Sequence, residues 1–216
     1  MDFDLITHSI PLLIQGTGVT LEITAVAVFI GMCIGCLMGI MRICNWKILR
    51  IIANVYIDCI RGTPLLVQIF IVYFALPAII GARIEKFPAA VIACSINSGA
   101  YVAEIFRAGI QSIDAGQMEA GRSLGLTWWQ TMRFIVLPQA FKRVIPPLGN
   151  EFIAMLKDSS LVSVIGFEEL TRTGQLIISR TYASLEIWTC VALIYLFMVL
   201  VVARFVAKLE KRFETK

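Results

Sequence analysis

Long apolar runs constrain this chain more than any other feature of its sequence. The first covers about residues 17–41. A helix rises about 1.5 Å per residue, so this run crosses a hydrocarbon core roughly 30 Å thick with some tilt. The composition agrees, because 58% of the residues are hydrophobic and only 16% are charged. Soluble domains are about half apolar and about a quarter charged. The sequence therefore predicts an all-α integral membrane protein.

The apolar stretch of residues 51–80 is interrupted by the segment "RGTP", which begins at Arg61. Thr63 can cap a helix whose first position is Pro64, since proline there loses no hydrogen bond that it would have made. The interruption predicts a short interfacial helix before the break and a second span at about residues 65–80.

Two further apolar runs predict spans at about residues 87–110 and 188–206. Between them, at about residues 140–160, only short apolar runs occur, separated by acidic and basic side chains. Ionisable residues inside membranes tend to face protein or water, so this segment fits a buried helix beside a pathway. With this segment, five spans are predicted within a single domain of residues 1–216.

Small residues recur along the first span. Gly31, Gly35 and Gly39 lie four positions apart, and Ala27 extends the series backwards. This spacing places the small residues on one helix face, where a second helix can approach closely. The series predicts a helix–helix packing face.

The distribution of basic residues predicts the orientation. The amino-terminal segment "MDFDLITHSI" is acidic and lacks the basic region of a cleavable signal peptide, so the first span is expected to remain in the mature chain. With the amino terminus outside and the carboxyl terminus in the cytoplasm, thirteen basic residues are cytoplasmic and four are external, a strong positive-inside bias. The cytoplasmic residues are Arg42, Lys47, Arg50, Arg107, Arg122, Arg133, Lys142, Arg143, Arg204, Lys208, Lys211, Arg212 and Lys216, and the external ones are Arg83, Lys86, Arg172 and Arg180.

Several function classes are disfavoured by the composition. The net charge of +4 requires no nucleic-acid partner. Cys33-x-x-Cys36 lies inside a lipid-length helix without a nearby histidine, so these cysteines are interpreted as packing residues and no metal site is predicted. No glycine is followed by lysine, so the chain has no Gly-x-x-x-x-Gly-Lys-[Ser/Thr] phosphate loop and is not expected to hydrolyse ATP itself.

A short polar helix is predicted at residues 117–124, ending at Gly125, a natural helix stop. Eight or so residues cannot maintain a helix alone in water. The helix must therefore dock on its own protein or on a partner. Trp128 and Trp129 follow it and suit the level of the lipid headgroups.

This stretch resembles the "EAA" loop of the permeases of ATP-binding-cassette (ABC) importers. Glu119-Ala120-Gly121 is followed after three residues by Gly125, and nine residues later by an Ile-x-Leu-Pro sequence. The third position departs from the usual alanine, although glycine still permits a close backbone approach. Further resemblance to the permeases for polar amino acids lies in "RGTPLLVQ" (61–68), "SGAYVAEIFRAGI" (98–110), "IVLPQAFKRVIPPLGNEFI" (135–153) and "LKDSSLVSVIG" (156–166).

The resemblance implies the ABC type I importer permease fold, with residues 117–125 as a cytoplasmic coupling helix. This helix would seat in a groove of a separate ATPase, which would bind the ATP and magnesium, so this chain would need no cofactor. A pair of ATPase subunits, a second permease subunit (identical or closely related) and an extracytoplasmic amino-acid-binding protein are the implied partners, in the inner membrane of a prokaryote. The implied coupling residues are Glu119, Ala120, Gly121, Arg122, Ser123 and Gly125.

A free amino acid is a zwitterion, so its site needs acceptors for the ammonium and donors for the carboxylate. The predicted lining residues are Asn97, Tyr101, Glu104, Lys157, Asp158, Ser159 and Ser160, and the predicted inner gate consists of Arg61, Thr63 and Gln68. A helix broken near the two serines could also present backbone groups. Structural interpretations remain open, since Lys157 and Asp158 can pair with other buried groups, Tyr101 can be a packing aromatic, and Glu104 can pair with Arg107 one turn later.

The leading hypothesis is a transporter subunit, not an enzyme, that imports a polar amino acid by ATP-driven alternating access. The acidic residues Glu22, Glu104, Glu151 and Asp158 favour a basic substrate, although carboxylates also pair internally. The alternative is a secondary carrier or channel driven by an ion gradient, with Asp158 and Glu104 as ligands of the coupling ion. No nucleophile–base arrangement supports a membrane-embedded enzyme.

Overall fold

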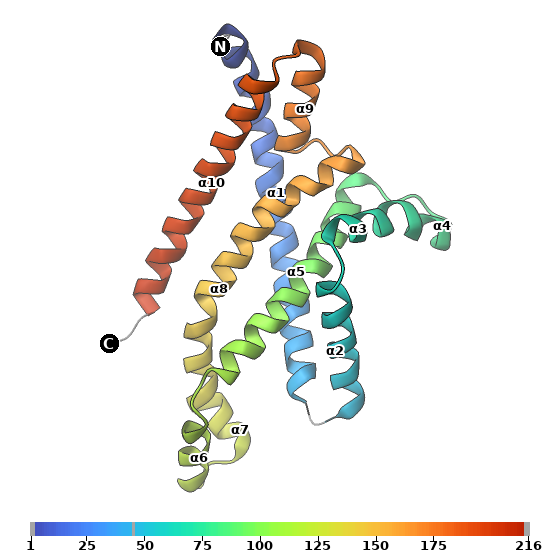
Figure 1. The fold of residues 1–216 in the computed structure, drawn as a ribbon. Helices are drawn as coiled ribbons and strands as arrows, with labels where there is room; N and C mark the ends of the chain where they lie inside the picture. The colour runs from blue at the N-terminus through green and yellow to red at the C-terminus, as the bar shows by residue number, and fades with distance from the viewer. Residues whose placement is uncertain (1–2, 45, 214–216) are drawn as a thin grey trace.

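The computed structural model describes residues 3–44 and 46–213, whose regular elements are helices (Figure 1). In chain order these are α1 (Phe3–Ile43), α2 (Lys47–Arg61), α3 (Leu65–Phe70), the π turn η1 (Ile71–Ala75), α4 (Leu76–Ile80), α5 (Lys86–Gln111), α6 (Ala115–Ser123), α7 (Trp128–Thr131), the π turn η2 (Met132–Val136), α8 (Leu137–Asp158), the 3-10 helix η3 (Ser159–Ile165), α9 (Leu170–Thr181) and α10 (Ser184–Phe213).

Among the described residues, three helices are long and apolar enough to cross a bilayer, namely α1, α5 and α10, which contain the predicted first, third and last spans. α1 extends beyond the predicted first span, because the helix begins at Phe3 and not near residue 17. A Cβ added at Gly16 would lie 3.0 Å from the Cα of Leu170, so the start of α9 packs directly on α1.

The chain bends by 103° between α2 and the helices of residues 65–80. α2, the helix before the bend, packs along α1 and α5 (Figure 1), and its predicted interfacial position stays a prediction. The predicted second span is divided into α3, η1 and α4. Counted with α2 as one bent span, it raises the number of candidate spans in the described residues to four. The predicted fourth span lies in α8, and the total of five remains a prediction.

Both π turns directly precede a Leu-Pro pair, η1 before Leu76-Pro77 and η2 before Leu137-Pro138. Proline has no N–H to donate, and its ring collides with the carbonyl four residues earlier. Widening the helix by one residue at this place accommodates the proline without ending the helix. η2 thereby connects α7 to α8, and it forms the support of α6 described below.

The predicted glycine face packs against α5. A Cβ added at Gly31 would lie 2.9 Å from the Cβ of Ser98, and one added at Gly35 would lie 2.5 Å from a methyl group of Val102. Both glycines are therefore required for the close approach of the two helices. Gly39 is less constrained, because its added Cβ would meet Phe106 at an ordinary 3.6 Å.

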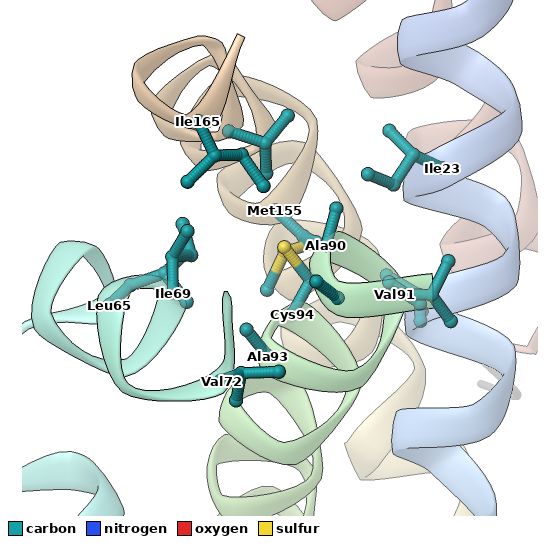
Figure 2. Close-up of a cluster of buried hydrophobic side chains, with 14 residues drawn as sticks. Ile23, Leu65, Ile69, Val72, Ala90, Val91, Ala93, Cys94, Met155 and Ile165 are labelled. Atoms are coloured by element: carbon teal, nitrogen blue, oxygen red, sulfur yellow. The ribbon is translucent and has the colours of Figure 1, made fainter. Parts of the chain in front are cut away.

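The largest apolar cluster lies where α1, α3, α5, α8 and η3 meet (Figure 2). Ile23 of α1, Ile69 of α3, Cys94 of α5 and Met155 of α8 are almost completely buried in it. Alanines on α5, such as Ala90, let the neighbouring helices approach closely. This cluster fixes the positions of α3, α5 and α8, which carry most of the polar residues of the predicted lining and gate.

Candidate functional site

The predicted short polar helix is α6, which begins two residues earlier than expected. Asp114 caps its amino terminus, since the side chain accepts a hydrogen bond of 2.6 Å from the backbone N–H of Gly116. Its carboxyl end turns at Gly125, whose φ of +85° lies in the left-handed region. Sequence reasoning thus located the end of this helix from its stop residue, Gly125, and missed the cap at Asp114.

The departure from alanine at the third motif position has a structural reason. Gly121 is buried against the residues that follow α6, and a Cβ added there would lie 2.5 Å from the Cγ2 of Thr131 and 3.1 Å from the Cδ1 of Ile135. An alanine would therefore collide with α7 and η2. Met118 adds a second contact, because it packs on the apolar cluster of Ile113, Met132, Val136 and Ala140. The supporting structure of α6 thus belongs to its own chain.

The opposite face of α6 has no such cover. The predicted coupling residues Glu119, Ala120, Arg122, Ser123 and Gly125 are all exposed. Leu124, directly after the helix, is 81% exposed. One side of α6 packs on α7 and η2, and the other side is exposed. This arrangement allows α6 to transmit a force between a docked partner and α8.

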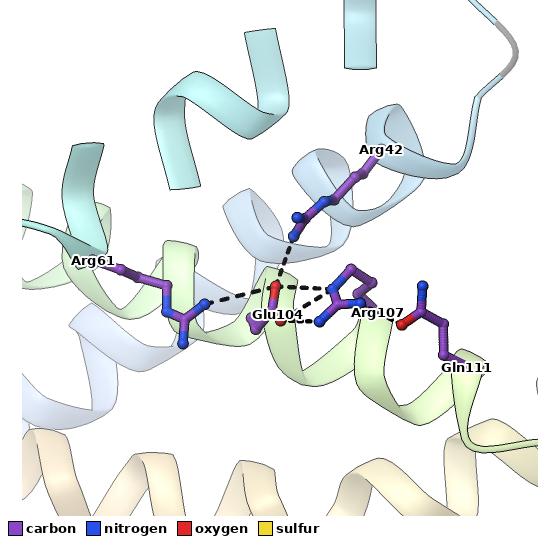
Figure 3. A network of polar contacts seen from close by, with 5 residues as sticks. All are labelled: Arg42, Arg61, Glu104, Arg107 and Gln111. Carbon is purple, nitrogen blue, oxygen red and sulfur yellow. Dashed lines mark hydrogen bonds and ion pairs between the residues drawn. The ribbon is translucent and has the colours of Figure 1, made fainter. Parts of the chain in front are cut away.

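Glu104 on α5 is surrounded by three arginines (Figure 3). Arg42 at the end of α1 donates to its Oε2 at 2.6 Å, and Arg107 donates through its Nε at 3.0 Å. Arg61 at the end of α2 approaches to 3.7 Å and also lies over the ring of Tyr101, 5.4 Å from its centre. The predicted Glu104–Arg107 pair is confirmed, and the ends of three helices meet at one carboxylate, the Glu104 cluster.

A second polar network joins Asn97 to the bend after α2. The amide of Asn97 donates to the Oε1 of Gln68 at 3.0 Å. Gln68 in turn donates to the carbonyl of Ile60 at 2.8 Å and to the hydroxyl of Thr63 at 3.0 Å. A predicted lining residue and two predicted gate residues therefore form one network, which ties the bend to α5.

The segment "LKDSS" marks the end of an α-helix, as expected. α8 ends at Asp158 and continues as η3. Lys157 and Asp158 are exposed, whereas Ser159 is buried and donates to the carbonyl of Leu156 at 2.8 Å. Ser160 is half-buried. The charged pair is available to a ligand, and Ser159 mainly stabilises the turn.

Arg61, Tyr101 and Glu104 line one open cavity of about 520 Å³ together with Ser112 and Arg143. The structure thus brings part of the predicted lining and gate to one cavity. Sequence reasoning missed Arg143 there and missed Arg42 as a partner of Glu104. Each comes from a helix distant in the sequence, and no local spacing connects them.

Sequence reasoning also missed Glu169, which is 0% exposed. Its carboxylate accepts hydrogen bonds from the backbone N–H groups of Thr171 at 2.9 Å and Arg172 at 2.8 Å. The hydroxyl of Tyr195 donates to it at 2.9 Å, and that of Thr20 lies at 3.4 Å. This Glu169 cluster joins α1, α9 and α10. Its sequence signal was an acidic residue directly before a helix start.

A bundle of lipid-length helices with charged clusters at helix ends, together with a short polar helix seated on α7 and η2, defines the class of protein: a helical membrane protein. Residues 31–215 match the family of binding-protein-dependent transport system inner membrane components, and the chain belongs to this family.

Two relatives match along almost the whole chain. The glutamine transport system permease protein of Escherichia coli is 47% identical, with 98% of this chain and 97% of that protein covered. The arginine transport system permease protein of Bacillus subtilis is 40% identical, with 98% and 96% covered.

Solved structures agree. The crystal structure of an amino acid ABC transporter with histidines superposes with a TM-score of 0.95 at 46% identity, covering 98% of this chain and 99% of that chain. A methionine ABC transporter superposes with a TM-score of 0.80 at 21% identity, over 94% and 97% of the two chains, which supports the fold.

The protein is therefore a permease subunit of an ABC importer and a multi-pass protein of the bacterial inner membrane. It is not an enzyme. Nucleotide binding belongs to a separate ATPase subunit, and a substrate-binding protein is a further partner of such systems. The secondary-carrier alternative is not supported.

Proposed function

We propose that this permease imports a neutral polar amino acid of the glutamine type. Its similarity to the glutamine permease supports this choice. So does the Glu104 cluster, because a carboxylate already paired with three arginines attracts no cationic substrate. Glu151 likewise accepts a hydrogen bond of 2.9 Å from Ser98. The acidic residues that favoured a basic substrate are thus partly engaged within the chain.

The observation that carries the transport mechanism is the seating of α6. In the proposed orientation, with the amino terminus outside, α6 faces the cytoplasm and a partner ATPase contacts Glu119, Ala120, Arg122 and Ser123. Movement of α6 passes through Gly121 and Thr131 into η2 and then into α8. Two states of the bundle then open the pathway to alternate sides.

The proposed pathway uses the polar residues in two groups. Lys157 and Asp158, exposed at the end of α8, offer a donor and an acceptor to a zwitterion, next to the half-buried hydroxyl of Ser160. Arg61 and Tyr101 line the cavity on the α6 side and act as the inner gate. Asn97 acts through Gln68 on the bend after α2 and positions this gate.

The proposed assembly contains two permease subunits, a pair of ATPase subunits and an extracytoplasmic binding protein. A single chain with three long apolar spans and one bent pair among its described residues offers few helices to enclose a pathway. A second permease, identical or closely related, completes it.

The test of coupling exploits the collision at Gly121. Overpacking costs about 1–3 kcal/mol, so Gly121→Ala should displace α6 and lower both substrate-stimulated ATP hydrolysis and uptake in vesicles. Thr131→Ala removes the two nearest atoms, so the double variant should recover most of the loss. If the double variant is no better than Gly121→Ala alone, α6 does not act through this contact.

A second variant tests the exposed face of α6, on which the partner ATPase is proposed to dock. Glu119→Ala should lower stimulated hydrolysis several-fold without changing thermal stability, because Glu119 is exposed. Glu168→Ala, an exposed carboxylate before α9 at the other end of the bundle (Figure 1), is the matched control. Glutamine should stimulate more strongly than arginine. Uptake by this chain alone under a sodium or proton gradient would contradict the proposal.

A further inference from the structure

An apolar cavity of about 630 Å³ lies between the end of α1 and the segment that supports α6. Its walls include Cys36 and Gly39 of α1, Phe106 of α5, and Trp128 and Trp129 of α7. None of the residues assigned to the transport pathway lines it. The cavity is therefore a feature separate from the site described above.

A second apolar cavity of about 350 Å³ adjoins it and shares the walls formed by Phe106, Ile110 and Leu137. Two tryptophans at the edge of the larger cavity are strongly exposed. Trp46 is 72% exposed and Trp129 is 73% exposed. Tryptophans are typical of the membrane–water boundary, where an apolar ring and an N–H donor meet lipid and water together.

Three basic side chains lie in or directly beside the walls of these cavities. Arg50 donates through its guanidinium to the carbonyl of Cys44, a wall residue, at 3.1 Å. Arg133 lines the second cavity and lies over the ring of Phe134, 5.6 Å from its centre. Lys47 follows the wall residue Trp46 and is exposed. These three cations have no carboxylate partner among the ion pairs of the described residues.

We propose that the two cavities hold the acyl chains of one anionic phospholipid, with its phosphate at Arg50 and Arg133. Two adjoining apolar cavities fit two acyl chains, and a basic mouth with exposed tryptophans fits a negatively charged headgroup. A second protein chain would need to cover the basic groups with its own carboxylates, whereas the lipid supplies the charge and the apolar chains in one molecule.

The site connects the bilayer to the coupling region. Its walls include Met132 of η2, the same residue that contributes to the apolar cluster beneath Met118 of α6. An occupied cavity therefore supports the segment on which α6 is seated. The lipid should stabilise the position of α6, so lipid composition should affect coupling in the assembled transporter.

The test measures lipid binding to the complete transporter by native mass spectrometry, with phosphatidylglycerol and phosphatidylcholine added in turn. The wild-type complex should retain phosphatidylglycerol at least tenfold more tightly than phosphatidylcholine. Cys36→Phe places a ring in the cavity and should weaken phosphatidylglycerol binding about tenfold, since each displaced methylene contributes to the affinity. Arg50→Gln and Arg133→Gln should each weaken it about fivefold and leave phosphatidylcholine binding unchanged.

Cys33→Phe is the matched control, because Cys33 is also exposed on α1 but does not line the cavity. If Cys36→Phe fails to fold, Gly39→Ala replaces it as the variant that fills the cavity. It adds only a methyl group, which would lie at an ordinary distance from Phe106. Equal retention of both lipids by the wild-type complex would overturn the proposal. Unchanged phosphatidylglycerol binding in Cys36→Phe or Gly39→Ala would also overturn it. Cross-linking of Cys36 between two permease chains would also overturn it, because a second copy would then cover the cavity.

Discussion

Two carboxylates, Glu104 and Glu169, each gather groups from three helices but do so by opposite means. Glu104 is paired with three arginines beside an open cavity, and its side chain is 20% exposed. Glu169 is completely buried and receives only neutral donors, two from the backbone and two from hydroxyl groups. α1 contributes to both clusters, through Arg42 and through Thr20, roughly 33 Å apart along the helix.

The difference indicates which part of the bundle can change during transport. Ion pairs near water contribute little net stability and exchange partners readily. Buried donors cost about 1–3 kcal/mol each when they are left unpaired, so the Glu169 cluster resists rearrangement. We therefore expect α1, α9 and α10 to move as one unit at the Glu169 cluster. The Glu104 cluster should open and re-form during each transport cycle.

The largest effect is expected from Glu169→Ala. The substitution leaves the two backbone N–H groups at the start of α9 and the hydroxyl of Tyr195 without their acceptor in a buried place. The expected loss is about 3 kcal/mol or more of unfolding free energy. It is measured as a lowered melting temperature of the purified complex in detergent.

Two controls separate this loss from a general effect of the segment. Glu168→Ala changes the exposed neighbouring carboxylate and should leave the melting temperature nearly unchanged. Tyr195→Phe removes one donor of the cluster and should cost about 1 kcal/mol. If Glu169→Ala melts like Glu168→Ala, the Glu169 cluster does not hold the helices together.

Glu104→Gln is expected to affect transport more than stability. The amide cannot neutralise three arginines, which then repel one another, and hydrogen bonds to charged groups contribute about 1.5–3 kcal/mol. Because the cluster is accessible to water, part of this loss is recovered by hydration. Uptake should fall several-fold, and ATP hydrolysis in the absence of substrate should rise as the inner gate loosens. Glu85→Gln, an exposed carboxylate before α5, is the control. An unchanged ratio of uptake to hydrolysis would contradict a role in gating.

Features set by local spacing could be predicted from the sequence. The Gly31–Gly35 face and the Glu104–Arg107 pair follow from periods of three to four residues, and the end of α6 follows from its stop residue, Gly125. The break in "RGTP" was also found, but not its 103° bend. The direction taken after a break depends on packing against α1 and α5, which no local pattern contains.

The long-range contacts could not be predicted. Arg42 and Glu104 are 62 positions apart, and Thr20 and Glu169 are 149 positions apart. A single sequence shows only that such groups are ionisable or polar, and not which of them meet. The same limit applies to Thr131, whose contact explains why the motif has glycine at position 121.

A smaller effect, on pH dependence, follows from Glu169. Burial raises the pKa of this carboxyl above its ordinary value of 4.5, although the N–H groups of Thr171 and Arg172 and the two hydroxyls lower it in part. The folded state then binds a proton more readily than the unfolded state. This contribution to stability is fully present below about pH 4.5 and is lost as the pH rises through the raised pKa. Glu169→Gln cannot ionise, so its melting temperature should depend less on pH over this range. A profile parallel to that of the wild type would show that Glu169 does not titrate there.

The smallest effect is expected from Arg61→Gln. Arg61 approaches Glu104 only to 3.7 Å, and its side chain is 40% exposed, so the pair should contribute less than about 1 kcal/mol. Arg42 lies at 2.6 Å with a side chain 23% exposed, and Arg42→Gln should lower the melting temperature more. Arg61→Gln should instead alter the rate of substrate release, because Arg61 lines the cavity with Tyr101. Arg61→Lys keeps the charge and should restore release in part. Equal melting losses for the two arginine variants would mean that the Glu104 cluster is a fixed structural unit like the Glu169 cluster, and the distinction between a fixed and a changing end of α1 would then fail.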